Sequence, residues 1–179
     1  MSNVFQRMNG FFTVIKLSIF HSSRISACLM RTLLSHNAKI TITGSGSLKT
    51  SWVLLGVNTY LEAEGSLEIG NGTYFNRNCT VVCKQKIFIG EHCAIGPNVC
   101  IYDHDHAFDE NGQICGEFRC ADITIGNNVW IGSNAVILRG TNIGDNCVIG
   151  ASAIISGTIP QNSLVKTKGS LVLQSLRNK

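Results

Sequence analysis

The sequence predicts an all-β fold in which short strands wind into stacked parallel coils, and a six-residue repeat is the main observation behind this prediction. The repeat is clearest where six consecutive units open at Ile125, Ile131, Ile137, Ile143, Ile149 and Ile155. A period of six fits neither the 3.6-residue turn of an α-helix nor the alternation of a single strand. It is typical of strands that each form one flat face of a coil, so three units make a triangular coil.

The composition agrees with a single domain of this kind. The 179 residues are 44 % hydrophobic and include 18 glycines but only 2 prolines, which suits a cored β-fold with many tight turns. The net charge of +4 is spread along the chain without a block of like charges. It would favour an anionic small ligand, and it gives no indication of nucleic-acid binding.

The first 38 residues differ from the rest of the chain. Apolar residues recur there at helical spacing, with Arg7, Lys16, Arg24 and Arg31 between them, and the apolar runs are too short and too polar to span a bilayer. We expect 1–38 to form a helical cap on the domain; the alternative is an amphipathic segment on the inner face of the cytoplasmic membrane. With no recognisable signal peptide, the expected location is cytoplasmic.

The repeat continues upstream of the six isoleucine units, with a slip of two residues before Ile89. Its earlier openers are Ile42, Leu48, Leu54, Tyr60, Ile69, Phe75, Val81, Ile89, Ile95 and Ile101. The pattern therefore predicts a β-helix domain over 39–165 and a C-terminal tail over 166–179.

Two positions in each unit are expected to point into the core. The opener must do so because neighbouring coils stack aliphatic side chains on one another. A small residue four positions later is the second: Thr73, Cys79, Cys93, Val99, Val129, Ala135, Thr141, Cys147 and Ala153. Three of these are cysteines, and among the eight cysteines there is no CxxC, so we interpret them as reduced thiols without a metal or redox role.

Glycine recurs directly after the opener, often followed by Asn or Asp. The positions are Gly70, Gly90, Gly96, Gly126, Gly132, Gly144 and Gly150. We expect these glycines to form corners with unusual backbone angles.

The repeat is interrupted over 103–122, and this interruption is the strongest functional signal in the sequence. The segment is polar and carries His104 and His106 beside four aspartates and Glu117. An interruption of the repeat predicts a loop that projects from the coils. Loops held on rigid scaffolds often carry catalytic groups.

The stretch ITIGNNVWIGSNAVILRGTNIGDNCVIGASAI resembles the hexapeptide-repeat acyltransferases. Within that superfamily it is similar to the sugar O-acetyltransferases, which include galactoside and maltose acetyltransferases and enzymes that acetylate capsule or lipopolysaccharide sugars. The resemblance covers 74–164. It implies a left-handed parallel β-helix, a homotrimer with active sites between subunits, acetyl-CoA as acyl donor and a sugar hydroxyl as acceptor, in surface polysaccharide or lipopolysaccharide biosynthesis.

The resemblance also implies a catalytic role for His106. A sugar hydroxyl is too weak an acid to attack a thioester unaided, so a base that titrates near neutral pH must take its proton. Asp103, Asp105 and Glu117 are the candidates for holding this imidazole in one tautomer, and the Gly-Glu pair of the family favours Glu117. His104 is the alternative base if the register is shifted.

The same resemblance implies the donor contacts along the groove and the acceptor contact of Asn76, whereas Lys166 and Lys168 are candidates because the phosphates need cations. Trp130 is expected beside the thioester, the backbone around Ser133, Ala135, Gly150 and Ala151 along the groove, and Lys166 and Lys168 near the phosphates. The expected acceptor contacts are Asn76, His104 and Asp105.

Three other interpretations of the function remain open at this point. One is an N-acetyltransferase that acts on an amino-sugar nucleotide, and another is a non-catalytic β-helix. The third is a zinc hydratase, which needs three histidines around an open metal position; His92, His104 and His106 are the only candidates in the repeat region. The acyltransferase interpretation requires no metal.

Overall fold

The computed structural model describes residues 25–27 and 32–166, and all elements in this part of the chain are β-strands. The helical segment predicted for the N-terminus therefore lies mostly outside the described residues; the described parts of 1–38 contain strands β1 (Ile25–Ala27) and β2 (Leu33–Leu34). No helix in the described chain is long and apolar enough to cross a membrane.

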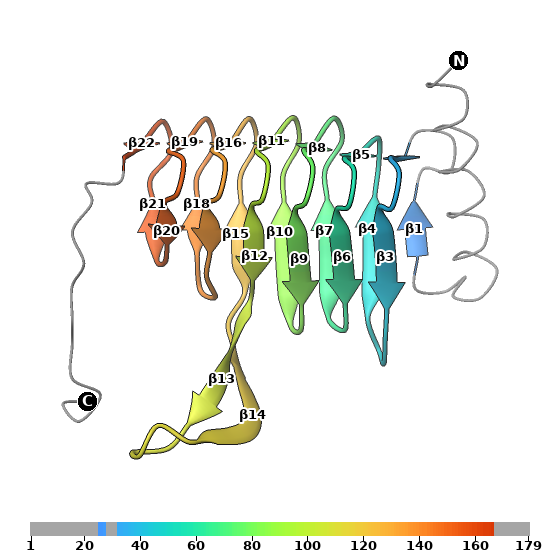
Figure 1. Ribbon diagram of the computed structural model, residues 1–179. Coiled ribbons are helices and arrows are strands. Elements are labelled where there is room, and N and C mark those ends of the chain that lie inside the picture. Colours follow the sequence, from blue (N-terminus) through green and yellow to red (C-terminus); the bar gives the residue numbers. More distant parts are fainter. Residues whose placement is uncertain (1–24, 28–31, 167–179) are drawn as a thin grey trace.

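Three parallel sheets wrap into a helix of stacked coils (Figure 1). The first sheet contains β1, β4 (Ser47–Thr50), β7 (Ser66–Ile69), β10 (Lys86–Ile89), β15 (Ile123–Ile125), β18 (Asn142–Ile143) and β21 (Thr158–Ile159). The second sheet contains β2, β5 (Leu54–Leu55), β8 (Tyr74–Phe75), β11 (Ala94–Ile95), β16 (Trp130–Ile131), β19 (Val148–Ile149) and β22 (Leu164–Val165). The third sheet contains β3 (Lys39–Ile42), β6 (Tyr60–Ala63), β9 (Thr80–Cys83), β12 (Cys100–Tyr102), β17 (Val136–Ile137) and β20 (Ile154–Ile155). The predicted parallel β-helix is confirmed, and the hexapeptide repeat fits a left-handed one.

The core consists of the two inward positions that the repeat predicts. Openers stack directly on one another in the sheets; Ile95 pairs with Phe75 on one side and with Ile131 on the other. Every opener from Ile69 onward is buried, and so is every small residue at the second inward position, including Cys79 and Cys147. Burial of this continuous aliphatic column is what holds the coils together.

The coils are not all of one length. Phe75 and Ile95 occupy equivalent places twenty residues apart, whereas Ile131 and Ile149 are eighteen apart. The longer coils lie upstream of the interruption, where strands of the first sheet have four residues, such as β7 and β10.

This difference in coil length makes the predicted openers Leu54 and Tyr60 wrong. Both are only half-buried, and the inward positions are taken by Leu55 and Leu61, each 1 % exposed. Counting in sixes from Ile42 lost the register, because a coil of twenty residues does not divide into three units of six.

The glycines after the openers allow close stacking rather than unusual backbone angles. A Cβ on Gly90 would lie 2.5 Å from the carbonyl oxygen of Gly126 in the next coil. The positive φ angles fall instead two residues beyond such glycines, on Asn98 (φ 59°) and Asn128 (φ 54°). Asparagine tolerates the left-handed region better than most residues, so it shapes the corner while glycine makes room for the neighbouring backbone.

Candidate functional site

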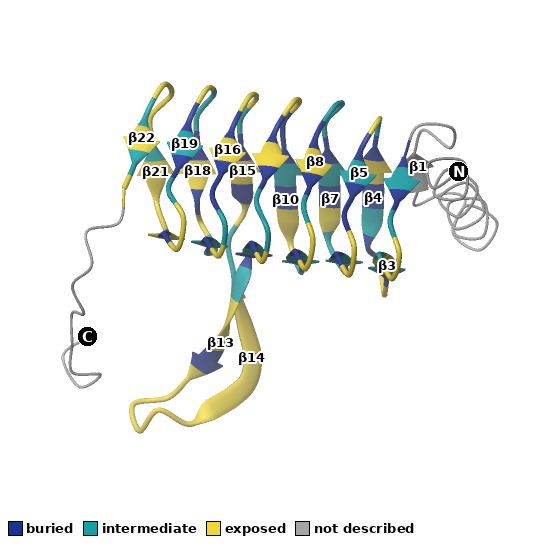
Figure 2. Ribbon diagram, turned by 45° about the horizontal axis from the view of Figure 1, so that its top comes forward, coloured by how far each residue is buried: buried dark blue, intermediate teal, exposed yellow. Residues whose placement is uncertain are grey.

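Residues 103–122 form a β-hairpin that projects from the coils. Its strands, β13 (His104–Phe108) and β14 (Ile114–Cys120), pair antiparallel, with His106 directly opposite Phe118. The chain leaves the helix after β12 in the third sheet and returns at β15 in the first sheet, so the hairpin stands at the corner between these two sheets (Figure 1). Figure 2 shows that most of it is exposed.

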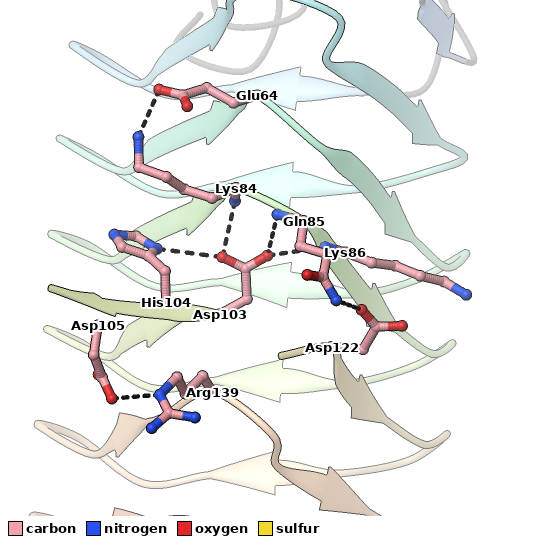
Figure 3. Close-up of polar contacts among 9 residues, drawn as sticks. All are labelled: Glu64, Lys84, Gln85, Lys86, Asp103, His104, Asp105, Asp122 and Arg139. Atoms are coloured by element: carbon pink, nitrogen blue, oxygen red, sulfur yellow. Dashed lines mark hydrogen bonds and ion pairs between the residues drawn. The ribbon is translucent and has the colours of Figure 1, made fainter. Parts of the chain in front are cut away.

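Asp103 anchors the root of the hairpin. Its side chain is fully buried, and its carboxylate accepts three backbone hydrogen bonds, from the N–H of Lys84 (2.8 Å), Gln85 (2.7 Å) and Lys86 (2.9 Å) (Figure 3). These donors form the turn between β9 and β10 in the preceding coil. A buried carboxylate that accepts three backbone N–H groups of the preceding coil ties the hairpin to that coil.

The same carboxylate holds His104. Its Oδ1 lies 3.2 Å from His104 Nδ1, which fits a hydrogen bond donated by the imidazole. The His104 side chain is only 14 % exposed, and its ring makes edge contacts with Tyr102 and Phe118. Asp103 was one of the candidates for orienting His106, but the structure brings it to His104 instead.

His106 is exposed on the projecting strand. Its ring lies 4.8 Å from the ring of Phe118, centroid to centroid, at an interplanar angle of 45°. In the described chain, no hydrogen bond joins either nitrogen of this imidazole to another residue. Glu117, the favoured orienting residue, is exposed and adjacent to Phe118 in β14, so strand alternation directs it to the face of the hairpin opposite His106.

Asp105 ties the hairpin to the following coil. Its Oδ2 lies 2.5 Å from Nε of Arg139, which follows β17, so the expected acceptor contact already has a cationic partner (Figure 3). Strand β13 is therefore held from both sides, by Asp103 toward the preceding coil and by Asp105 toward the following one.

One phenol and two thiols around the hairpin root stay protonated at neutral pH. The pKa of Tyr102 is raised to about 12 by burial and by the neighbouring Cys100. Burial also raises the pKa of Cys83 to about 12, and the Asp103 carboxylate adds to this effect. The pKa of Cys120 is raised by burial too, so none of these three supplies an anionic nucleophile.

A groove of about 400 Å³ runs along the outer surface of the second sheet. Five of the predicted donor and acceptor residues line it: Asn76, Trp130, Ser133, Gly150 and Ala151. The structure thus brings together residues that lie up to 75 positions apart in the sequence (151 − 76 = 75).

The hollow follows from side-chain size on three neighbouring strands. Ala94 pairs with Tyr74 on one side and with Trp130 on the other, so a small residue lies between two aromatic ones. Tyr74 and Trp130 are 39 % and 57 % exposed. Tyr74 was missed from the sequence, although it precedes its opener as Trp130 does.

Two of the predicted donor residues that the structure describes, Ala135 and Lys166, do not line the groove. Ala135 is fully buried in the core, so its side chain cannot contact a ligand there. Lys166 is exposed beyond β22, at the last described residue, and Lys168 lies outside the described residues.

The hairpin and the groove lie on opposite sides of one chain. The groove is on the second sheet, whereas the hairpin leaves from the corner between the first and third sheets (Figures 1 and 2). In a triangular coil this corner is the one that faces away from the second sheet. His106 and Trp130 therefore cannot meet within a single copy of the chain.

The three candidate histidines of the repeat region do not come together at one metal site. His92 lies at the turn between β10 and β11, whereas His104 and His106 are on the hairpin. Within residues 25–27 and 32–166, no three His, Cys, Asp or Glu side chains come together in a way that could hold a metal ion.

Comparison with known proteins connects this geometry with acyl transfer. Residues 122–157 match the family model described as bacterial transferase hexapeptide (six repeats). The chain is 38 % identical to galactoside O-acetyltransferase of Escherichia coli over 121 residues, which cover 64 % of this chain and 60 % of that protein. It is 28 % identical to WbbJ of Escherichia coli, named for lipopolysaccharide biosynthesis and O-acetyl transfer, over 62 % of each chain.

A solved structure of galactoside acetyltransferase in complex with coenzyme A is also similar. Its TM-score is 0.52 at 28 % identity, and the match covers 89 % of this chain and 74 % of that one. The chain spans about 60 % of the length of the curated relatives that it matches. The match to the family model, over 122–157, lies on the coils that follow the hairpin.

Proposed function

We propose that this chain, a hexapeptide-repeat β-helix that resembles the sugar O-acetyltransferases, transfers the acetyl group of acetyl-CoA to a sugar hydroxyl. The observation that carries the proposal is the groove on the second sheet, where Asn76, Trp130, Ser133, Gly150 and Ala151 gather as the resemblance implies. A groove bounded by an aromatic pair and by the turn backbone at Gly132–Ser133 and Gly150–Ala151 suits a long, thin donor whose amides need hydrogen-bond partners.

The fit of acetyl-CoA to the groove rests on three features. Trp130 and Tyr74 offer exposed aromatic surface to the pantetheine arm, and Ala94 between them leaves depth for it. Gly132 lines the floor, where a Cβ would lie 2.6 Å from the backbone nitrogen of Ala151, so the coils stack closely there. Lys166 is exposed near the C-terminal end of the same sheet and would attract the phosphates.

His106 is the proposed general base. Its imidazole takes the proton of the sugar hydroxyl as the oxygen bonds to the thioester carbonyl carbon. The carbon–sulfur bond then breaks, and the imidazolium returns the proton to the departing sulfur, which gives an O-acetyl sugar and free coenzyme A. His106 suits this role because its ring is exposed, whereas the ring of His104 is largely enclosed and bonded to Asp103.

The complete site is proposed to form between two copies of the chain. One copy presents His106 on a corner that faces away from its own groove, so the hairpin of each copy must reach the groove of a neighbour. Such a head-to-tail contact closes into a ring when the rotation permits. We therefore propose a homotrimer, the assembly that the resemblance implies.

The acceptor is proposed to be a sugar of a surface polysaccharide or lipopolysaccharide. The similarity to WbbJ, whose name refers to lipopolysaccharide biosynthesis, supports this choice. Enzyme and acceptor would then meet in the cytoplasm at the inner face of the membrane, with the basic, apolar segment 1–38 as the proposed contact. The division into that segment, a β-helix domain over 39–165 and a tail over 166–179 remains part of this proposal.

The test is release of free thiol from acetyl-CoA by purified protein, with a panel of sugars, nucleotide sugars and oligosaccharides. Amino-sugar nucleotides belong in the panel, because preference for them would indicate N-acetylation instead. Wild type should release thiol only with an acceptor present. His106→Ala should reduce this by about 100-fold or more, as expected for loss of a general base.

Two further variants assign the base. His36→Ala removes an exposed histidine at the turn after β2, far from the hairpin, and should match wild type. If His106→Ala keeps full activity while His104→Ala loses it, the base is His104. If wild type neither binds coenzyme A nor releases thiol, the proposal of an acetyltransferase is refuted.

A further inference from the structure

Phe118 is a large aromatic residue on the hairpin with no place in the core. It is 41 % exposed, on a strand that leaves the coils altogether. Leaving so much apolar surface in water forgoes the stabilisation that burial would give. Its position is better explained by what the ring contacts, namely His106, His104 and Lys84.

The contact with His106 is direct and comes from opposite strands. The two residues are cross-strand partners, and their ring centroids are 4.8 Å apart at 45°. Cross-strand neighbours on one face of a hairpin restrict each other's rotamers. In the described part of the chain, the His106 imidazole has no hydrogen bond that would fix its orientation, so Phe118 is the contact that limits its motion.

Phe118 is in turn connected to the preceding coils. Nζ of Lys84 lies 4.5 Å from the centre of the Phe118 ring, within the range of a cation–π contact. The same ammonium lies 2.7 Å from Oε1 of Glu64, and the Lys84 side chain is only 16 % exposed (Figure 3). The Lys84 backbone N–H also bonds to Asp103, so the lysine is held at both ends.

We propose that Phe118 is a positioning residue for His106, with Lys84 and Glu64 holding the Phe118 ring against the imidazole. The inference rests on the proposed role of His106 as base. Phe118 does not need to touch the acceptor or the donor. It restricts the imidazole to the orientation in which proton transfer is efficient, and a loss of alignment slows catalysis without weakening donor binding.

The kinetic test compares Phe118→Leu with Phe118→Tyr and with a matched control, Phe108→Leu. Phe108 lies on the same hairpin and is 43 % exposed, but its ring contacts Arg119 rather than a histidine. Phe118→Leu should lower kcat by about 10- to 100-fold and leave KM for acetyl-CoA within about twofold. Phe118→Tyr keeps the ring and should retain most of the activity; Phe108→Leu should behave as wild type.

Three kinetic results would overturn the proposal: a wild-type kcat in Phe118→Leu, an equal loss in Phe108→Leu, or no rescue by Phe118→Tyr. Circular dichroism and the denaturation midpoint of each variant show whether the fold is intact. If Phe118→Leu does not fold, the comparison of Phe118→Tyr with Lys84→Met decides, because Lys84→Met removes the cation that holds the ring and should lower kcat as well.

A second measurement is independent of catalysis. In wild type labelled with ¹³C-histidine, the Phe118 ring current should displace the His106 imidazole resonance, which His106→Ala identifies. The displacement should vanish in Phe118→Leu and persist in Phe118→Tyr and Phe108→Leu. An unchanged His106 resonance in Phe118→Leu would refute the contact itself. If wild type transfers acetyl to no acceptor, the proposed function fails, and the resonance still decides the contact.

Discussion

The carboxylate of Asp103 lies 3.2 Å from the imidazole of His104, and no hydrogen bond in the described chain joins it to His106. The same carboxylate accepts the backbone N–H groups of Lys84, Gln85 and Lys86. Asp103 thus closes the turn of the preceding coil and holds one histidine at the hairpin root. The exposed histidine two residues further along is left free to meet a ligand.

Asp103→Asn should destabilise the protein strongly. An amide has one acceptor oxygen where the carboxylate has two, so at least one of the three backbone N–H groups loses its partner and the buried side chain of Asp103 is left poorly satisfied. We expect the free energy of unfolding to fall by about 2 to 4 kcal/mol, measured by urea denaturation.

Asp122→Asn is the matched control for this change. Asp122 is exposed, and its carboxylate accepts only the side chain of Gln85. Its substitution should change the free energy of unfolding by less than about 0.5 kcal/mol. Equal effects of the two substitutions would mean that Asp103 does not anchor the hairpin.

Trp130→Ala should weaken coenzyme A binding without destabilising the fold. The Trp130 side chain is 57 % exposed, so its loss removes a wall of the groove rather than core packing. We expect Kd for coenzyme A to rise about tenfold or more, measured by titration calorimetry. Trp52→Ala is the control, because Trp52 is similarly exposed, at 51 %, but borders a neighbouring hollow that shares only Tyr74 with the groove. A larger loss of affinity in Trp52→Ala would place the donor elsewhere.

Alkaline pH should destabilise the protein through its buried thiols. Burial raises the pKa of Cys83 from 9.0 to about 12, so in the folded protein this thiol stays protonated where the unfolded chain has lost its proton. The contribution is fully present below pH 9 and is lost as pH rises from 9 toward 12. The free energy of unfolding, measured in urea with reductant from pH 7 to 11, should therefore fall above pH 9.

Two variants isolate this effect of Cys83. Cys83→Ala should give a shallower fall above pH 9, even though its stability at pH 7 is lower. Cys115→Ser should follow wild type, because Cys115 is exposed on the hairpin. A fall above pH 9 that is just as steep in Cys83→Ala would show that other groups cause it.

Much of the fold could be predicted because one rule acts on every coil. Each opener must bury an aliphatic side chain on its neighbour, so the repeat can be read directly from residues such as Ile95 and Ile131. The rule failed at Leu54 and Tyr60, where coils of twenty residues shifted the register. The recurring glycines were also attributed to unusual backbone angles. In the structure their missing side chain lets neighbouring coils stack closely, and such a contact between coils cannot be seen in a local pattern.

The site was predictable on the coils and less so on the hairpin. The resemblance implied Trp130 and Ser133, which lie in the regular repeat, and both line the groove on the second sheet. The partners of His104 and His106 depend on which face of the hairpin each side chain occupies and on a turn nineteen residues upstream of Asp103 (103 − 84 = 19). Polar loop sequence carries no such long-range information, and Phe118 gave no signal beyond being an apolar residue among polar ones.

The central claim is that the hairpin of one copy completes the groove of another, and mixing two inactive variants tests it most directly. His106→Ala lacks the proposed base, and Ser133→Trp fills the groove with a bulky side chain; each should be inactive alone. When the two are co-expressed in equal amounts, about a quarter of the sites in a random ring receive an intact hairpin and an intact groove. The account predicts thiol release at roughly that fraction of the wild-type rate. Activity of the mixture no higher than that of the two variants purified separately would contradict it.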